Sequence, residues 1–224
     1  MFPRMIKIKQ NMPVQTVEDV VGAVLKSLDS IKARQINLEG KTIGITAGSR
    51  GINNISLILK TIADYVKEAK GNPVLIPSMG SHGGGALEGQ REVLASLGIT
   101  EEAVGAPVRC CIETVMLGET PSGVPVYCNK EAVKMDGLIV VNRIKSHTDF
   151  SGKIESGICK MLAIGLGSEK GAITTHSHAI VKGYEEVITE VAKVMISKLP
   201  VLFAVGILEN WKSETAEIGA FLPG

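Results

Sequence analysis

The alternation of short apolar runs with segments of helical periodicity constrains this chain most. The β-prone run 41–46 ends in a glycine-bearing turn, and from Asn53 to Gly71 the apolar residues recur at the spacing of a helix. A second apolar run, 73–77, follows. This order of elements places successive strands parallel and covers the sheet with helices. The sequence therefore predicts an α/β fold with a mostly parallel sheet and helices on both faces.

The same alternation continues along the chain, and glycine, proline or a change of period bounds each further element. We expect a strand at 5–8, a helix opened by Thr16, a helix at 88–97, a hairpin around 121–127, a strand at 137–141, a helix at 181–197 and a strand at 201–207. The length suits a single α/β domain, residues 1–224. Because the chain stops abruptly after a polar stretch, we expect a second, C-terminal domain to be absent.

Three polar side chains directly follow predicted strands. Arg50 follows the run 41–46, His82 follows 73–77, and His147 follows 137–141. In parallel sheets the functional loops lie at the carboxyl ends of the strands. The sequence therefore predicts that these loops meet at one edge of the sheet and form the site there.

The overall composition excludes several classes of function. The net charge of +1 gives no electrostatic basis for binding nucleic acid or an anionic membrane. No apolar run approaches the roughly 20 residues that span a bilayer. The four cysteines show no Cys-x-x-Cys spacing, which favours reduced thiols in a cytoplasmic protein over a disulfide framework.

The histidines are few, and all four lie in stretches rich in glycine, serine or threonine. They are His82, His147, His176 and His178. Imidazole transfers protons near neutral pH and binds borderline metals. Their placement suggests a site assembled from several connecting loops. For each histidine taken alone, an ordinary turn residue is an equally good interpretation.

Lys160 lies in the otherwise apolar run 158–164, sixteen positions before His176. Burial there would lower the pKa of the amine and make it available for covalent chemistry. The alternative is a lysine at the edge of a helix whose ammonium group reaches solvent.

Several features near His147 suit an anionic ligand. Arg143 and Lys145 precede it, and the backbone N–H groups of Ser151 and Gly152 could bind a phosphate. Arg50 could contact a carboxylate through two hydrogen bonds, or could simply be solvated. The standard nucleotide-binding, serine-hydrolase and zinc-protease motifs are absent from the sequence.

Taken together, these residues resemble the nickel-pincer-nucleotide lactate racemase family. The resemblance rests on Gly80-Ser81-His82-Gly83-Gly84, on the segment 147–152, and on Lys160 followed sixteen positions later by His176. It extends from about residue 41 to 207. The ordered set of Arg, His, His, Lys and His is more specific than any of its members.

The resemblance implies a role for each of these residues. Lys160 would carry the covalently attached nickel-pincer nucleotide, and His176 would bind its nickel. His82 and His147 would be the paired acid and base, with Arg50 as a carboxylate or phosphate contact. The implied reaction is racemisation or epimerisation of a 2-hydroxy acid by hydride transfer to and from the cofactor. The implied partners are this small substrate and the proteins that synthesise the cofactor.

Two departures from the family pattern point to a 2-hydroxy acid other than lactate. The turn around Arg50 lacks the acidic residue, histidine and proline expected there, and thirteen positions separate His147 from Lys160, more than expected. In the family a C-terminal domain closes over the site, so we expect this chain alone to be inactive. Two other hypotheses stay open: a non-catalytic protein that binds a nucleotide or carboxylate, and a zinc-assisted hydrolase using His176 and His178.

Overall fold

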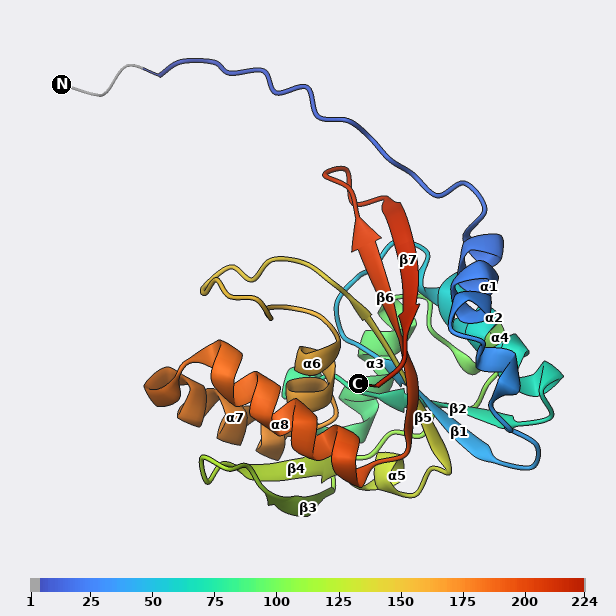
Figure 1. Cartoon of the computed structure of the whole chain (residues 1–224), viewed down its shortest axis with the longest axis vertical. Coiled ribbons are helices and arrows are strands. Elements are labelled where there is room, and N and C mark those ends of the chain that lie inside the picture. The colour runs from blue at the N-terminus through green and yellow to red at the C-terminus, as the bar shows by residue number, and fades with distance from the viewer. Residues whose placement is uncertain (1–4, 224) are drawn as a thin grey trace.

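The computed structural model describes residues 5–223, which form a five-stranded sheet with helices on both faces (Figure 1). The strand order is β2-β1-β5-β6-β7; the first four strands are parallel, and β7 is antiparallel to β6. The predicted α/β fold is confirmed. The strands are β1 (Thr42–Ala47), β2 (Asn72–Pro77), β5 (Gly137–Arg143), β6 (Val201–Glu209) and β7 (Thr215–Phe221).

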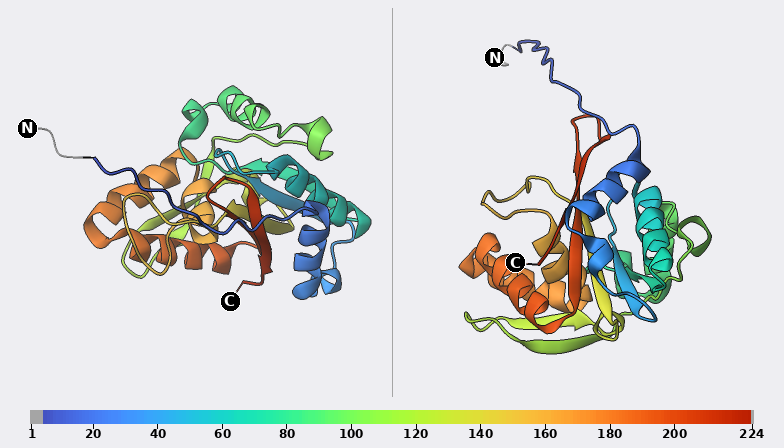
Figure 2. Two further views of the ribbon diagram at one scale, coloured as in Figure 1. Left: turned by 90° about the horizontal axis from the view of Figure 1, so that it is seen from above. Right: turned by 45° about the vertical axis from the view of Figure 1, so that its right-hand side comes forward.

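The helices from the first half of the chain contribute to the core on one face of the sheet, and those from the second half to the core on the other (Figures 1 and 2). The connecting segments contain three short helical turns, η1 (Ala33–Gln35), η2 (His82–Gly85) and η3 (Met161–Gly165). The helices are α1 (Val20–Ser30), α2 (Ile55–Glu68), α3 (Leu87–Ser96), α4 (Glu101–Val104), α5 (Lys130–Val133), α6 (Ile158–Lys160), α7 (Ser168–Lys182) and α8 (Tyr184–Lys198).

Strand β5 shows why the sheet is covered on both faces. Ile139 and Val141 join the core beneath α1 and α2, whereas Leu138 and Val140 join the core beneath α8. All four side chains are buried, and burial of each contributes roughly 1.5–3 kcal/mol. A strand that is apolar on both faces needs a layer on each, which is the arrangement observed.

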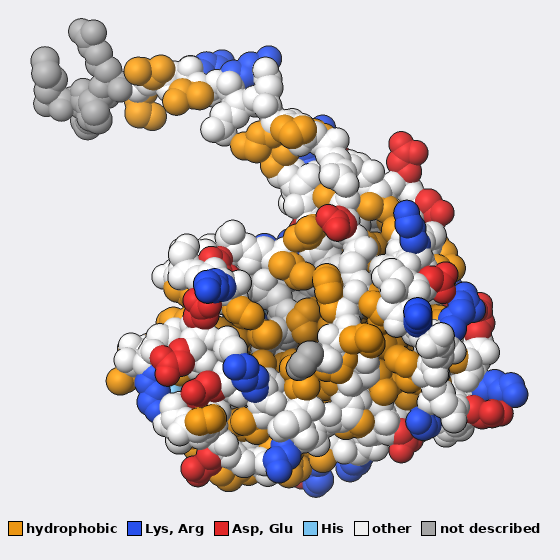
Figure 3. Space-filling view, in the orientation of Figure 1, with side chains coloured by type: hydrophobic (Ala, Val, Ile, Leu, Met, Phe, Trp, Pro, Cys, Tyr) orange, Lys and Arg blue, Asp and Glu red, His pale blue; other side chains and the backbone are white. Residues whose placement is uncertain are grey.

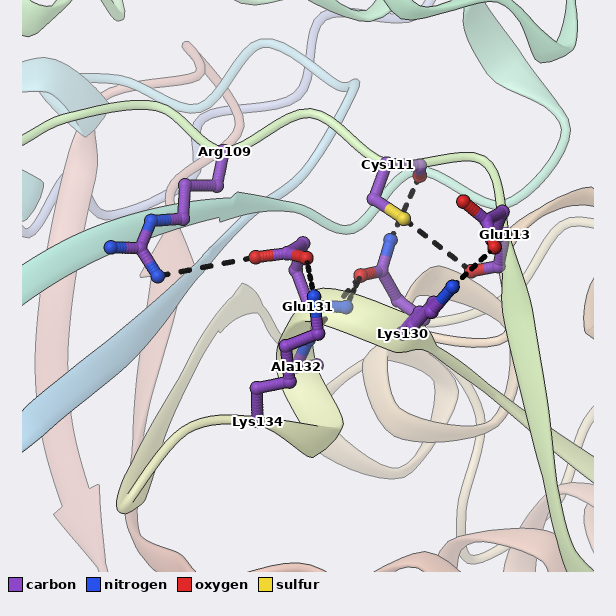
Figure 4. Close-up of polar contacts among 8 residues, drawn as sticks. Arg109, Cys111, Glu113, Lys130, Glu131, Ala132 and Lys134 are labelled. Atoms are coloured by element: carbon purple, nitrogen blue, oxygen red, sulfur yellow. Dashed lines mark hydrogen bonds and ion pairs between the residues drawn. The ribbon is translucent and has the colours of Figure 1, made fainter.

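A two-stranded antiparallel sheet, β3 (Thr114–Glu119) with β4 (Pro125–Asn129), lies against α7 and α8. It confirms the predicted hairpin. The buried Asn129 accepts from the N–H groups of Glu131 and Ala132, and its amide donates to the Cys111 carbonyl at 2.9 Å. Ion pairs between Lys130 and Glu113 and between Arg109 and Glu131 add to this region (Figure 4).

Several details differ from the sequence prediction. The helix expected at 181–197 starts only at Tyr184, because Gly183 separates it from α7, which was not predicted. Residues 5–8 form no strand: they are extended and exposed, and they run away from the rest of the protein (Figure 2). The first helix starts at Val20 and is capped by Asp19, whose carboxylate accepts from Gly22 N–H; Thr16 instead donates to Glu214. Strand β7, which forms an antiparallel hairpin with β6, was not predicted because Glu217 and Gly219 interrupt its apolar residues.

On the face seen in Figure 3, hydrophobic side chains gather in a hollow between the 144–157 loop and strands β6 and β7. Leu208, Phe221 and Leu222 are among the exposed apolar residues of the strand pair and its end.

All four cysteines are free thiols, as predicted, and two of them are buried. No helix in the described part of the chain is long and apolar enough to cross a membrane.

Candidate functional site

A cavity of 570 Å³ lies where the loops after β1, β2 and β5 come together. It therefore lies at the carboxyl ends of the parallel strands, as the sequence predicts. Its size is typical of sites for small ligands. Its walls include five of the predicted site residues: Arg50, His82, His147, Lys160 and His176.

The loop after β1 is anchored beside Arg50. The N–H of Asn53 donates to the Glu209 carboxylate at 2.6 Å, and the Asn53 side-chain carbonyl accepts from the hydroxyl of Thr215 at 2.9 Å. These contacts bind the loop to β6 and β7, while the Arg50 side chain stays exposed at the cavity. An arginine in this position can reach an anionic ligand without rearrangement of its backbone.

The loop after β2 needs glycine for its conformation. Gly83 has φ +77°, and a Cβ there would come within 2.9 Å of the Gly89 backbone. The turn holds His82 so that its Nδ1 lies 3.0 Å from the Met79 carbonyl. Because a carbonyl only accepts, Nδ1 carries a proton, and the unprotonated Nε2 of the neutral ring can act as a base.

The loop after β5 is closed by Glu155. Its carboxylate accepts from the N–H of His147 at 2.5 Å and from the N–H of Gly152 at 3.0 Å. Lys145 and Ser156 also pair through their backbones and join the two ends of the loop. The hydrogen bonds from Gly152 and His147 lower the pKa of Glu155, so the carboxylate is ionised and holds the loop.

His147 and Lys160 are in direct contact, with His147 Nε2 2.7 Å from Lys160 Nζ. The Asp149 N–H donates to His147 Nδ1 at 3.1 Å, so the neutral ring carries its proton on Nε2. That proton can be donated only to an unprotonated Lys160 amine. His147 and His82 therefore have opposite tautomers: His147 presents an N–H, and His82 presents a lone pair.

The environment favours the neutral form of Lys160. Burial lowers the pKa of its amine, and the charges of Lys145 and Arg50 lower it further. Burial and the charge of Lys160 lower the pKa of His147 as well. Lys160 lies at the junction of α6 with the π-helical turn η3, a type of irregularity frequent at functional sites.

His176 and His178 lie on helix α7, which corrects the expectation that they occupy a connecting loop. Residues two apart on a helix point in different directions. His176 lines the cavity, and its pKa is lowered by burial and by the charge of Lys160. His178 does not line the cavity; its Nδ1 lies 2.8 Å from the Thr174 carbonyl of the same helix. The paired ligands that motivated the zinc-hydrolase hypothesis are thus separated.

The structure does not bring Ser151 and Gly152 to this cavity. Ser151 lines a neighbouring cavity of 940 Å³, and the Gly152 N–H is donated to Glu155. Asn142, which the sequence did not single out as a site residue, does line the site. The signal for Asn142 was present, since it is a polar residue directly after the apolar run of β5.

The charges around the cavity favour an anion. Arg143 is paired with Glu209, but Arg50 and Lys145 also line the cavity, against the single carboxylate of Asp149. Within residues 5–223, no group of three or more His, Cys, Asp or Glu side chains is placed to hold a metal ion. His176 thus contributes a single imidazole, kept neutral and suited to act as a ligand.

One comparison identifies a family, and two solved structures share the fold. The model of the lactate racemase N-terminal domain matches residues 3–187. The lactate racemase apoprotein from Thermoanaerobacterium thermosaccharolyticum is similar in structure, with a TM-score of 0.66 and 16% identity over 95% of this chain. A protein from Thermotoga maritima gives a TM-score of 0.68 and 14% identity over 93% of this chain. The chain spans 56% of the length of each. No match was found among curated protein sequences.

Proposed function

Because the chain belongs to the lactate racemase N-terminal domain family, we propose that its cavity is the cofactor-binding and acid–base site of a 2-hydroxy-acid racemase or epimerase. The observation that carries the proposal is the convergence of His147, Lys160 and His176 on one cavity that also holds Arg50 and His82. The contact of Lys160 Nζ with His147 Nε2 at 2.7 Å and the lowered pKa of the amine support this role, because covalent attachment requires the unprotonated amine.

The site fits the cofactor that the resemblance implies, a nickel-pincer nucleotide. Lys160 would carry it through its half-buried amine, whose pKa is lowered, and the imidazole of His176 would supply a nitrogen ligand to nickel. Arg50 and Lys145 would contact its phosphate or the substrate carboxylate. When bound, this group supplies the acceptor and donor of the hydride that leaves and returns to C2 of the substrate.

The two remaining histidines move the hydroxyl proton. His82, with a free Nε2, is arranged to take a proton, and His147, with its proton on Nε2, is arranged to give one. Acylation of Lys160 would remove the amine lone pair and release the His147 N–H for the substrate. The two enantiomers present their hydroxyl groups to opposite sides, so each direction of the reaction uses the histidines in opposite roles.

Mass spectrometry of the intact protein, with metal analysis, tests this proposal. The chain is co-expressed with a pincer-cofactor pathway, and a known racemase is loaded in the same cells as a positive control. We expect an adduct of nucleotide size on Lys160 and nickel near one per chain, both absent from Lys160→Ala. Unmodified protein without nickel, in cells that load the control, would instead support a non-catalytic protein that binds a nucleotide or carboxylate.

A further inference from the structure

Aromatic side chains are scarce in this chain, at 4% of residues, yet two of them lie directly behind the site. Phe150 is stacked on the His147 ring, with the centroids 4.3 Å apart and the planes at 29°. Tyr184 is stacked on Phe150 at 5.1 Å and 11°. The His147 and Tyr184 centroids are themselves only 6.3 Å apart, so the three rings form one compact cluster.

Tyr184 also reaches the second histidine of the site. Its ring lies 5.9 Å from that of His176, edge to face at 62°. Tyr184 is the first residue of α8, whereas His147 is on the loop after β5 and His176 is on α7. One side chain therefore connects two histidines that the backbone places on separate elements.

The ring cluster lies where two cavities adjoin. His147 and His176 line the 570 Å³ cavity, whereas Phe150 and Tyr184 line the 940 Å³ cavity. His147 consequently has an aromatic ring behind it and Lys160 Nζ at its Nε2. Without that wall the ring could turn into the larger cavity and lose its contact with Lys160.

We propose that Tyr184 is a positioning residue, which holds the His147 ring against Lys160 both directly and together with Phe150, and which holds His176 through an edge-to-face contact. The ring, and not the hydroxyl, supplies these contacts: among the described residues, no hydrogen bond to the Tyr184 hydroxyl is found. The role of this placement in turnover rests on the proposed function, but the placement itself can be tested on the chain alone. Misplacement of a reacting group by about 1 Å can reduce a rate by about 100-fold.

The test compares Tyr184→Phe with Tyr184→Leu by NMR of the unloaded chain. In wild type and Tyr184→Phe we expect nuclear Overhauser contacts between the His147 ring and the Lys160 side chain. In Tyr184→Leu these contacts should be lost and the His176 ring signals should shift, with folding verified by circular dichroism. Ile180→Ala is the matched control, because it shortens a highly exposed side chain that lines the larger cavity. It should leave the His147–Lys160 contacts and the His176 ring signals unchanged.

Retention of the His147–Lys160 contacts in Tyr184→Leu would overturn the proposal, because the Tyr184 ring would then only fill space and would not position His147. If Tyr184→Leu does not fold, Phe150→Leu provides the same comparison from the next ring of the cluster. Loading at Lys160, measured by mass as above, should fall about tenfold or more in Tyr184→Leu and recover in Tyr184→Phe. Failure of all proteins to load, with the NMR result as expected, would count against the proposed function and not against this placement.

Discussion

At the scale of single residues, the site depends on the state of one amine. Lys160 is cationic at neutral pH in most surroundings, but here it is half-buried and faces the N–H of His147, with Lys145 and Arg50 nearby. Each of these features disfavours the ammonium form. The same residue is the one that the family resemblance makes the attachment point, so the physical environment and the implied chemistry agree.

Labelling of Lys160 should therefore respond to pH differently from that of an ordinary lysine. Because the pKa of its amine is lowered from 10.5, the reactive neutral form appears at lower pH in the folded chain than in urea-unfolded chain. Competitive acetylation followed by peptide mass spectrometry measures the midpoint. Lys145→Met, which removes a neighbouring cation, should move the midpoint of the folded chain upward. Coincident folded and unfolded midpoints would contradict the assigned environment.

At the scale of elements, the junction of α7 with α8 places Tyr184 beside His176. Gly183 is the single residue between these helices and has φ +99° and ψ 138°. Residues with a side chain rarely adopt this backbone conformation, although no atom lies within 4 Å of a Cβ placed at Gly183. The cost of substitution is therefore in the backbone and not in packing.

Gly183→Ala should lower the free energy of unfolding by about 1–3 kcal/mol, the usual cost of such a backbone conformation. Urea denaturation measures the change. Gly51→Ala is the control, since Gly51 lacks a positive φ and its Cβ would meet only Leu97 at 3.8 Å; it should change stability by less than about 1 kcal/mol. Equal effects of the two variants would show that the Gly183 conformation is not strained for alanine.

At the scale of the whole molecule, Glu209 connects the site to the sheet. Its carboxylate pairs with Arg143 of β5 and accepts from the N–H of Asn53 in the loop that carries Arg50. The Glu209 side chain is only 7% exposed, whereas the surface pair of Lys60 and Asp64 is more than 40% exposed on each side. Removing one partner of a buried pair leaves the other charge uncompensated.

Glu209→Gln should therefore destabilise the protein by about 2 kcal/mol and lower the melting temperature by about 4–8 °C. Lys60→Ala, which breaks an exposed pair within α2, should cost less than about 1 kcal/mol. Thermal unfolding followed by circular dichroism compares the two variants. A melting temperature of Glu209→Gln equal to that of Lys60→Ala would show that the Arg143 pair contributes no more than a surface pair.

Local periodicity was enough to predict the elements whose apolar pattern is strong, such as α2 and β5, and parallel strands imply that their following loops meet. The sequence by itself therefore determined the fold class and the edge of the sheet that carries Arg50, His82 and His147. It did not determine that His176 lies on a helix, because the glycine and threonine residues around it have low helix propensity. In the structure, small residues of α7 such as Gly171 pack closely on Tyr127, and this tertiary packing outweighs the low propensity. The hydrogen bond of Lys160 with His147 and the contact of Tyr184 with both rings were decided only by the tertiary structure, since they join side chains from separate elements whose distances no spacing encodes.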